Sequence, residues 1–160
     1  MGPLPRAVLT TRDAAILRGL IGRHGAALDR LIAAKLAHAA TVLPECIGRD
    51  IVTLHSRVAY ASQDAPPDMR IVVHSEALAV PGMTIPVYAP RGLALLGARV
   101  GDTVAVPGGD GDREMLTVLA VPYQPEAGGF ALAARGDAGT VPAPRPPSAT
   151  ILRLHRGARP

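Results

Sequence analysis

The sequence predicts an α+β fold, and three observations support that prediction. Before residue 42, apolar residues recur at helical spacing in two stripes separated by Gly22-Arg-His-Gly25. After residue 50, several segments rich in β-branched residues follow, each bounded by proline or glycine. One short leucine-rich run, residues 93–96, lies between two of those segments. Helices followed by a run of strands are typical of an α+β domain.

The first helical region, residues 10–41, predicts an antiparallel hairpin that follows a short lead-in at residues 1–9. Thr10 or Thr11 is a suitable N-cap, and Asp13 would lie in the first turn, where the helix dipole favours a negative charge. The glycines of residues 22–25 break the helix, and so short a connection makes the two helices antiparallel neighbours. The two apolar stripes are Ile16, Leu17, Leu20 and Ile21, and then Leu28, Leu31, Ile32, Leu36 and Ala39.

Residues 42–127 predict a small antiparallel sheet crossed by one helix. Proline and glycine clusters place turns at residues 62–68 and 107–112. The expected strands are residues 50–60, 69–74, 85–89, 103–106 and 114–121. Beyond residue 127 the chain is rich in Ala, Gly, Pro and Arg, so residues 128–160 are expected to be a mostly disordered tail.

The helix of this domain is expected to begin at Pro90, because the fixed φ of proline suits the first position of a helix. Gly97 stands where a C-terminal cap needs a residue with positive φ. Leu93, Leu96 and Val100 recur at helical spacing, and we expect them to hold the helix against the sheet.

Composition limits the classes of function and the cellular compartment that we expect for this protein. The chain has 17 basic and 13 acidic residues and a pI near 10, with Lys35 as its only lysine. The arginines are scattered, which fits either a solvated basic surface or a module that binds DNA or RNA non-specifically. The single cysteine, Cys46, excludes an internal disulfide and fits a reducing cytoplasm. No apolar run approaches the length of a membrane span, and we expect a cytoplasmic monomer without membrane contact.

The sequence predicts no catalytic, metal-binding or cofactor-binding residues. The histidines lack metal-ligand spacing. His55 and Ser56 would point to opposite faces of a strand, so they cannot act as a catalytic pair. The Pro107–Asp112 loop lacks the lysine of a phosphate-binding loop and is expected to be a hairpin turn. Arg23 and His24 lie at the hairpin tip, which is either a solvated turn or a positive tip that meets an acidic or nucleic-acid surface.

Three motifs in order resemble the regulator of nucleoside diphosphate kinase (Rnk) family, a relative of the C-terminal domain of the Gre-type transcription elongation factors. The central one is Ala89-Pro90 followed by Ala94-Leu-Leu-Gly97 and Gly101-Asp102-Thr-Val104. It is preceded by Asp50-Ile-Val-Thr-Leu-His-Ser-Arg-Val58 and followed by Leu119–Ala127. The two predicted helices also resemble the short N-terminal coiled coil of that family.

The resemblance implies an FKBP-like sheet domain without prolyl isomerase activity that docks on RNA polymerase near the secondary channel. The expected contact residues are Tyr88, Ala89, Pro90 and Arg91, with the hairpin directed toward the channel. Gre-type cleavage factors carry two acidic residues at the tip of a long coiled coil, which help to hold a catalytic magnesium ion. Residues 22–25 contain no carboxylate, and Mg²⁺ needs oxygen ligands. We therefore expect a non-enzymatic regulator that does not stimulate transcript cleavage.

Overall fold

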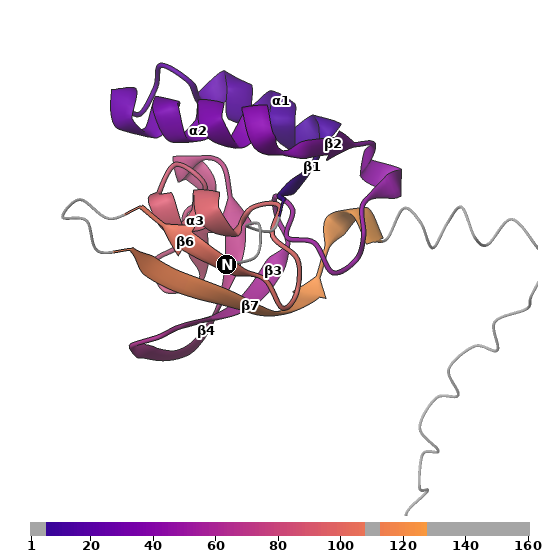
Figure 1. Cartoon of the computed structure of the whole chain (residues 1–160), viewed down its shortest axis with the longest axis vertical. Coiled ribbons are helices and arrows are strands. Elements are labelled where there is room, and N and C mark those ends of the chain that lie inside the picture. The colour runs from indigo at the N-terminus through magenta and orange to yellow at the C-terminus, as the bar shows by residue number, and fades with distance from the viewer. Residues whose placement is uncertain (1–5, 108–112, 128–160) are drawn as a thin grey trace, which may run out of the picture.

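The computed structural model describes residues 6–107 and 113–127, and within them the α+β prediction is confirmed. Two N-terminal helices lie over one side of a curled five-stranded sheet, with a short helix between them and the sheet (Figure 1). The elements are β1 (Val8–Thr10), α1 (Thr11–Leu20), α2 (Ala26–His38), β2 (Ala40–Val42), η1 (Pro44–Cys46), β3 (Arg57–Ser62), β4 (Ala65–Val73), η2 (Glu76–Leu78), β5 (Thr84–Pro86), α3 (Pro90–Leu95), β6 (Thr103–Val106) and β7 (Glu114–Tyr123).

The sheet has the strand order β5-β4-β3-β7-β6, and it is mixed rather than wholly antiparallel as expected. The β3–β4, β3–β7 and β6–β7 pairs are antiparallel, whereas β5 runs parallel to β4. The chain between them, residues 74–83, crosses back before β5 begins, so β5 has the same direction as β4. The Pro107–Asp112 turn that joins β6 to β7 lies mostly outside the described residues, as does the predicted tail at 128–160.

The expected strand at residues 50–60 is wrong in its first half. Ile51 forms only an isolated bridge with Arg99, and β3 begins at Arg57. Between them the Ser56 hydroxyl donates to the Thr53 carbonyl at 2.7 Å and accepts from the Thr53 N–H at 3.1 Å. These local bonds satisfy backbone groups that a strand would offer to a neighbour, so the segment turns instead of pairing.

The two consecutive prolines lie inside β4, not in a turn as expected, because the β3–β4 connection occupies only residues 63–64. Pro66 and Pro67 fall where the β3–β4 register shifts, between the Tyr60 and Ser62 pairs. Strand β5 pairs only with Ile71–Val73, so this part of β4 has no second neighbour. A proline without an N–H is tolerated at such an edge.

Both helices of the hairpin contribute to the same hydrophobic core as the sheet. Leu17, Leu20, Leu28 and Ile32 are buried together with residues of β3, β7 and α3. The hairpin therefore forms a layer on the sheet domain, with its apolar faces turned toward that domain. None of the helices within residues 6–107 and 113–127 is long and apolar enough to cross a membrane.

The base of the hairpin is tied to the sheet domain by hydrogen bonds. Strand β1 begins in the lead-in and ends at Thr10, and it pairs in parallel with β2. The Val8 N–H donates to the Gly97 carbonyl at 2.9 Å. Of the two predicted N-cap candidates, Thr10 is the N-cap of α1, and its hydroxyl accepts from the Asp13 N–H at 2.9 Å. The Asp13 carboxylate in turn accepts from the Leu54 N–H at 3.3 Å. Burial raises the pKa of Asp13 to about 6, because a charged carboxylate loses water there.

Helix α3 begins at Pro90 and is followed by Gly97 with φ +82°, so both predicted boundaries are confirmed. Leu93 and Leu96 are buried as expected, and Leu95 is buried with them. Val100 is 38% exposed, so its expected packing against the sheet is wrong. The helix ends before it, and the turn after Gly97 carries Val100 away from the face that its sequence spacing suggested.

Candidate interaction site

Residues 88–91, called the Tyr88–Arg91 loop below, lead from the end of β5 into the first turn of α3, which begins at Pro90. Hydrogen bonds hold this segment at its base. The Val87 N–H donates to the Val73 carbonyl at 2.8 Å, and the Ala89 N–H donates to the Pro86 carbonyl at 3.1 Å. Within the loop, Tyr88 and Ala89 are half-buried, whereas Pro90 and Arg91 are exposed. The loop therefore presents a proline and an arginine on a fixed backbone.

Gly92 makes this close turn possible. A Cβ atom at position 92 would lie 2.1 Å from the Pro86 carbonyl oxygen and 2.6 Å from the Pro86 carbonyl carbon. Both are backbone atoms at the end of β5, so they cannot yield as a flexible side chain would. The first turn of α3 thus packs directly on the strand before it, and this contact sets the position of Pro90 and Arg91.

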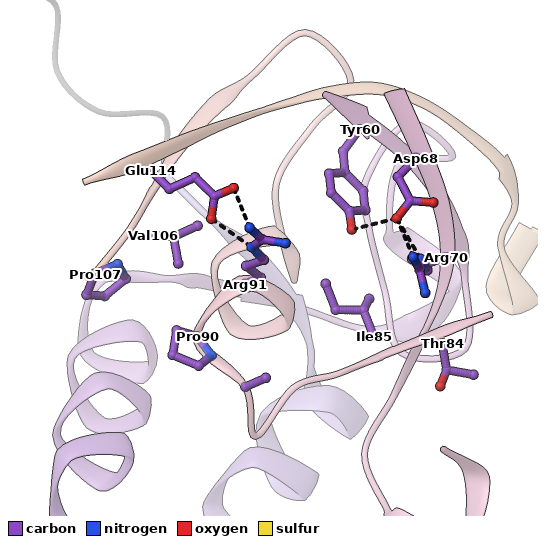
Figure 2. A pocket seen from close by; sticks show the side chains of 11 residues that line it. Tyr60, Asp68, Arg70, Thr84, Ile85, Pro90, Arg91, Val106, Pro107 and Glu114 are labelled. Atoms are coloured by element: carbon purple, nitrogen blue, oxygen red, sulfur yellow. Dashed lines mark hydrogen bonds and ion pairs between the residues drawn. The ribbon is translucent and has the colours of Figure 1, made fainter. Parts of the chain in front are cut away.

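A cavity of about 510 Å³ opens beside the loop. Figure 2 shows Arg91 and Glu114 facing each other on one side and Tyr60, Asp68 and Arg70 on the other. The Arg91 guanidinium donates to both carboxylate oxygens of Glu114 at 2.7 Å, a bidentate pair between α3 and β7. The apolar part of the lining includes Ile85, Pro90, Val106 and Pro107.

Electrostatics on the far side of this cavity favours the ionised Asp68. The Arg70 side chain bonds the Asp68 carboxylate at 2.7 Å and lowers its pKa. The Tyr60 hydroxyl lies 3.5 Å from the same carboxylate. Burial is the largest cause that raises the pKa of Tyr60, so its hydroxyl stays protonated. The cavity carries two cations and two anions, each guanidinium paired with a carboxylate.

The hairpin tip lies directly against the loop. The rings of His24 and Tyr88 are stacked, with centroids 4.6 Å apart and planes 8° from parallel. The tip itself is a turn in which the Gly22 N–H donates to the Asp29 carboxylate at 3.0 Å. The structure thus brings together the two groups of candidate residues, the tip and the loop, although no pattern in the sequence predicts that they lie side by side.

A second hollow, of about 140 Å³, lies between α2 and α3 on the other side of Pro90. Leu31 and Lys35 of α2 line it together with Pro90. The Lys35 ammonium donates to the Ala94 carbonyl at 3.3 Å, and burial lowers the pKa of Lys35 to about 8. Pro90 therefore stands as a ridge between two hollows, with the hairpin along one of them.

Two of the histidines and the cysteine that were weighed as chemical candidates lie in the described part of the chain. His55 and His74 meet edge to face with ring centroids 5.1 Å apart, and Cys46 is an exposed free thiol. Among residues 6–107 and 113–127, no three His, Cys, Asp or Glu side chains gather as metal ligands would.

Four residues beside the loop were missed in the sequence: Tyr60, Asp68, Arg70 and Glu114. Asp68 and Arg70 are two apart on one strand, so they share a face, and that spacing could have predicted their pairing. Glu114 is 23 residues from Arg91, and only the sheet topology brings them together.

Comparisons with known proteins agree with this architecture. Residues 47–123 match the family model of the transcription elongation factor GreA/GreB C-terminal domain. The chain is 38% identical over 99 residues to the regulator of nucleoside diphosphate kinase of Escherichia coli, covering 60% of this chain and 71% of that protein. The protein of the same name from Shigella flexneri matches to the same extent.

A solved structure matches as well. The prokaryotic transcription elongation factor GreA/GreB from Nitrosomonas europaea has 28% sequence identity and a TM-score of 0.60, covering 74% of this chain and 99% of that one. The protein therefore belongs to the regulator of nucleoside diphosphate kinase family and carries a GreA/GreB C-terminal domain.

Proposed function

We propose that this protein is a non-enzymatic transcription factor that binds RNA polymerase near its secondary channel through the loop of Tyr88, Ala89, Pro90 and Arg91. The observation that supports this most directly is the exposed Pro90–Arg91 ridge, held rigid by Gly92, within the GreA/GreB C-terminal domain. A rigid, partly apolar ridge is suited to protein recognition, since little conformational entropy is lost when a partner seats on it.

The proposal includes no stimulation of transcript cleavage. The tip presents Arg23 and His24, and the nearest carboxylate of the hairpin, Asp29, is engaged by the Gly22 N–H. A magnesium ion shared with the polymerase would need free oxygen ligands at the tip. The expected role is therefore to occupy the polymerase and modulate elongation.

Binding is tested with purified RNA polymerase and the full-length protein, by competition with a Gre-type factor. Wild type is expected to displace the Gre-type factor, and Pro90→Asp is expected to lose this ability because a charge replaces the apolar ridge. Wild-type protein that fails to compete, or a Pro90→Asp variant that competes equally, contradicts the proposal. Faster RNA shortening in a backtracked complex after addition of the protein contradicts the cleavage part alone.

A nucleic-acid-binding module is the second candidate, and the pI near 10 favours it. Binding to duplex DNA through phosphate contacts weakens steeply as salt rises, whereas binding governed by the Pro90 ridge depends on salt much less. A salt titration on duplex DNA, with and without residues 128–160, separates the two candidates. Tight DNA binding that disappears with the tail would favour the module.

A further inference from the structure

The hairpin tip and the Tyr88–Arg91 loop are held next to each other by contacts at three levels. His24 stacks on Tyr88 at the tip itself. Lys35 of α2 donates to the Ala94 carbonyl of α3. Ile32, between these two points, is fully buried in the shared core. The tip therefore keeps its place relative to the loop, because a movement of the hairpin would break all three contacts.

The loop is too small to form a protein interface alone. A stable interface usually takes about 800 Å² and 20–30 residues from each partner. Four loop residues, of which two are half-buried, supply a small part of that area. The stacked His24 ring directly borders Tyr88, so a partner seated on the loop extends onto the tip.

The charge of this end of the hairpin indicates the chemistry of the partner. Residues 18–30 carry three arginines, Arg18, Arg23 and Arg30, all exposed, against one aspartate, Asp29. The loop adds Arg91, whose charge is balanced by Glu114. Opposite charges across an interface guide encounter and select the partner, so the hairpin end favours an acidic surface.

Nucleic acid fits this surface less well than protein. Each guanidinium that borders the cavity is paired with a carboxylate, Arg70 with Asp68 and Arg91 with Glu114, so the cavity offers a phosphate backbone no uncompensated positive charge. Arg91 is already held by two hydrogen bonds to Glu114. A mixed surface with a proline ridge and a basic margin is suited to a protein segment with acidic side chains.

We infer that Arg23 and His24 of the tip and Tyr88, Pro90 and Arg91 of the loop form one composite docking surface, the tip–loop surface, for an acidic protein segment. The inference rests on the proposed function, and it assigns to RNA polymerase the acidic segment that meets the tip. Arg23 supplies the charge that faces this segment. His24 acts through Tyr88, as a positioning residue that fixes the tip against the loop.

The test measures the affinity of the full-length protein for purified RNA polymerase at low and high salt. Arg23→Glu is expected to weaken binding about five-fold or more at low salt and by less at high salt, because screening removes the charge contribution. His24→Ala is expected to weaken it less. Arg49→Glu is the matched control, since Arg49 is also an exposed arginine. It lies in the connector after β2, and the α2 helix, about 20 Å long, separates that connector from the tip. The Arg49→Glu variant is expected to bind within about two-fold of wild type.

The results of these variants distinguish a failure of the tip–loop surface from a failure of the proposed function. If Arg23→Glu and His24→Ala bind like wild type while Pro90→Asp loses binding, the partner meets the loop alone and the composite surface is wrong. Tighter binding by either tip variant would mean that the tip covers the loop, which also overturns the inference. If Arg23→Glu impairs duplex DNA binding but leaves polymerase binding intact, the tip faces nucleic acid. If Pro90→Asp binds like wild type, the proposed function itself fails. Thermal unfolding of each variant shows whether it remains folded.

Discussion

The sheet domain and the helical hairpin bury side chains in one core, yet their backbones are stabilised in different ways. Strand β3 pairs with β4, its neighbour in sequence, and with the distant β7, so the sheet is held by hydrogen bonds between strands. The hairpin helices have 10 and 13 residues, lengths at which isolated helices are marginal in water. The hairpin therefore depends on burial of Leu17 and Ile32 against the domain. Its tip is positioned by the domain, not by the hairpin itself.

Gly92→Ala, in the sheet domain, is the substitution with the largest expected effect on the free energy of unfolding. The new Cβ would lie 2.1 Å from a backbone oxygen, so β5 and α3 must separate. We expect a loss of at least about 4 kcal/mol in the free energy of unfolding, measured by urea denaturation. Gly19→Ala in α1 is the control. A Cβ there meets nothing within 4 Å, so the control should gain about 0.5–1 kcal/mol. Equal stability of the two variants would show that the close contact at Gly92 does not matter.

The next effect tests whether the hairpin unfolds with the domain. Ile32→Ala removes a fully buried side chain and is expected to cost about 2–5 kcal/mol. Because the core is shared, helix content by circular dichroism and tyrosine fluorescence should be lost in one transition. Ile21→Ala, at a residue that is 44% exposed, is the control and should cost far less. Two separate transitions would mean that hairpin and domain unfold independently.

Asp13 joins the two regions, and its titration should make their association pH-dependent. The unfolded chain releases the Asp13 proton near pH 3.8, whereas the folded protein holds it up to about pH 6. The protonated Asp13 therefore contributes its full share to the free energy of unfolding below pH 3.8. This contribution is lost as the pH rises through 6. This rise in the pKa corresponds to about 3 kcal/mol.

The charges near Asp13 modify its titration. Glu126 raises the pKa of Asp13 further, and Arg12 opposes this. Asp13→Asn resembles the protonated carboxyl, so the dependence of the unfolding free energy on pH between 4 and 7 should flatten. Asp64→Asn, in the exposed β3–β4 turn, should leave it unchanged. If Asp13→Asn leaves the pH dependence of the unfolding free energy unaltered, Asp13 is not the group that causes it.

The smallest effect concerns Lys35, the half-buried contact between α2 and α3. Its pKa is lowered from 10.5 to about 8, so the charged form is disfavoured in the folded protein. The free-energy cost of burying the charged ammonium is full below pH 8 and disappears as the pH rises toward 10.5. Lys35→Met keeps the apolar stem and should stabilise the protein by about 1 kcal/mol at pH 7, allowing for solvent screening and for the lost bond to Ala94. Arg30→Met, at an exposed position, is the control. If Lys35→Met destabilises the protein, the hydrogen bond to Ala94 contributes more than the desolvation of the ammonium costs.

The sequence alone determined the local features of this protein. Thr10, Pro90 and Gly97 mark helix ends through their own backbone and side-chain chemistry, which needs no distant partner. The ordered motifs from residue 50 to residue 127 predicted the family, which the comparisons confirm. The exposed loop of Pro90 and Arg91 was also predicted as a candidate site.

Only the tertiary structure decided what depends on contacts between distant residues. The parallel direction of β5, the bidentate pair of Arg91 with Glu114 and the stack of His24 on Tyr88 join segments that are separate in sequence. The Ser56 hydroxyl also overrode the strand propensity of residues 52–56. Local periodicity predicts which face of a helix or strand is apolar, but not which apolar faces meet. That depends on how the shared core is best filled, and it is this packing that places the hairpin tip beside the loop.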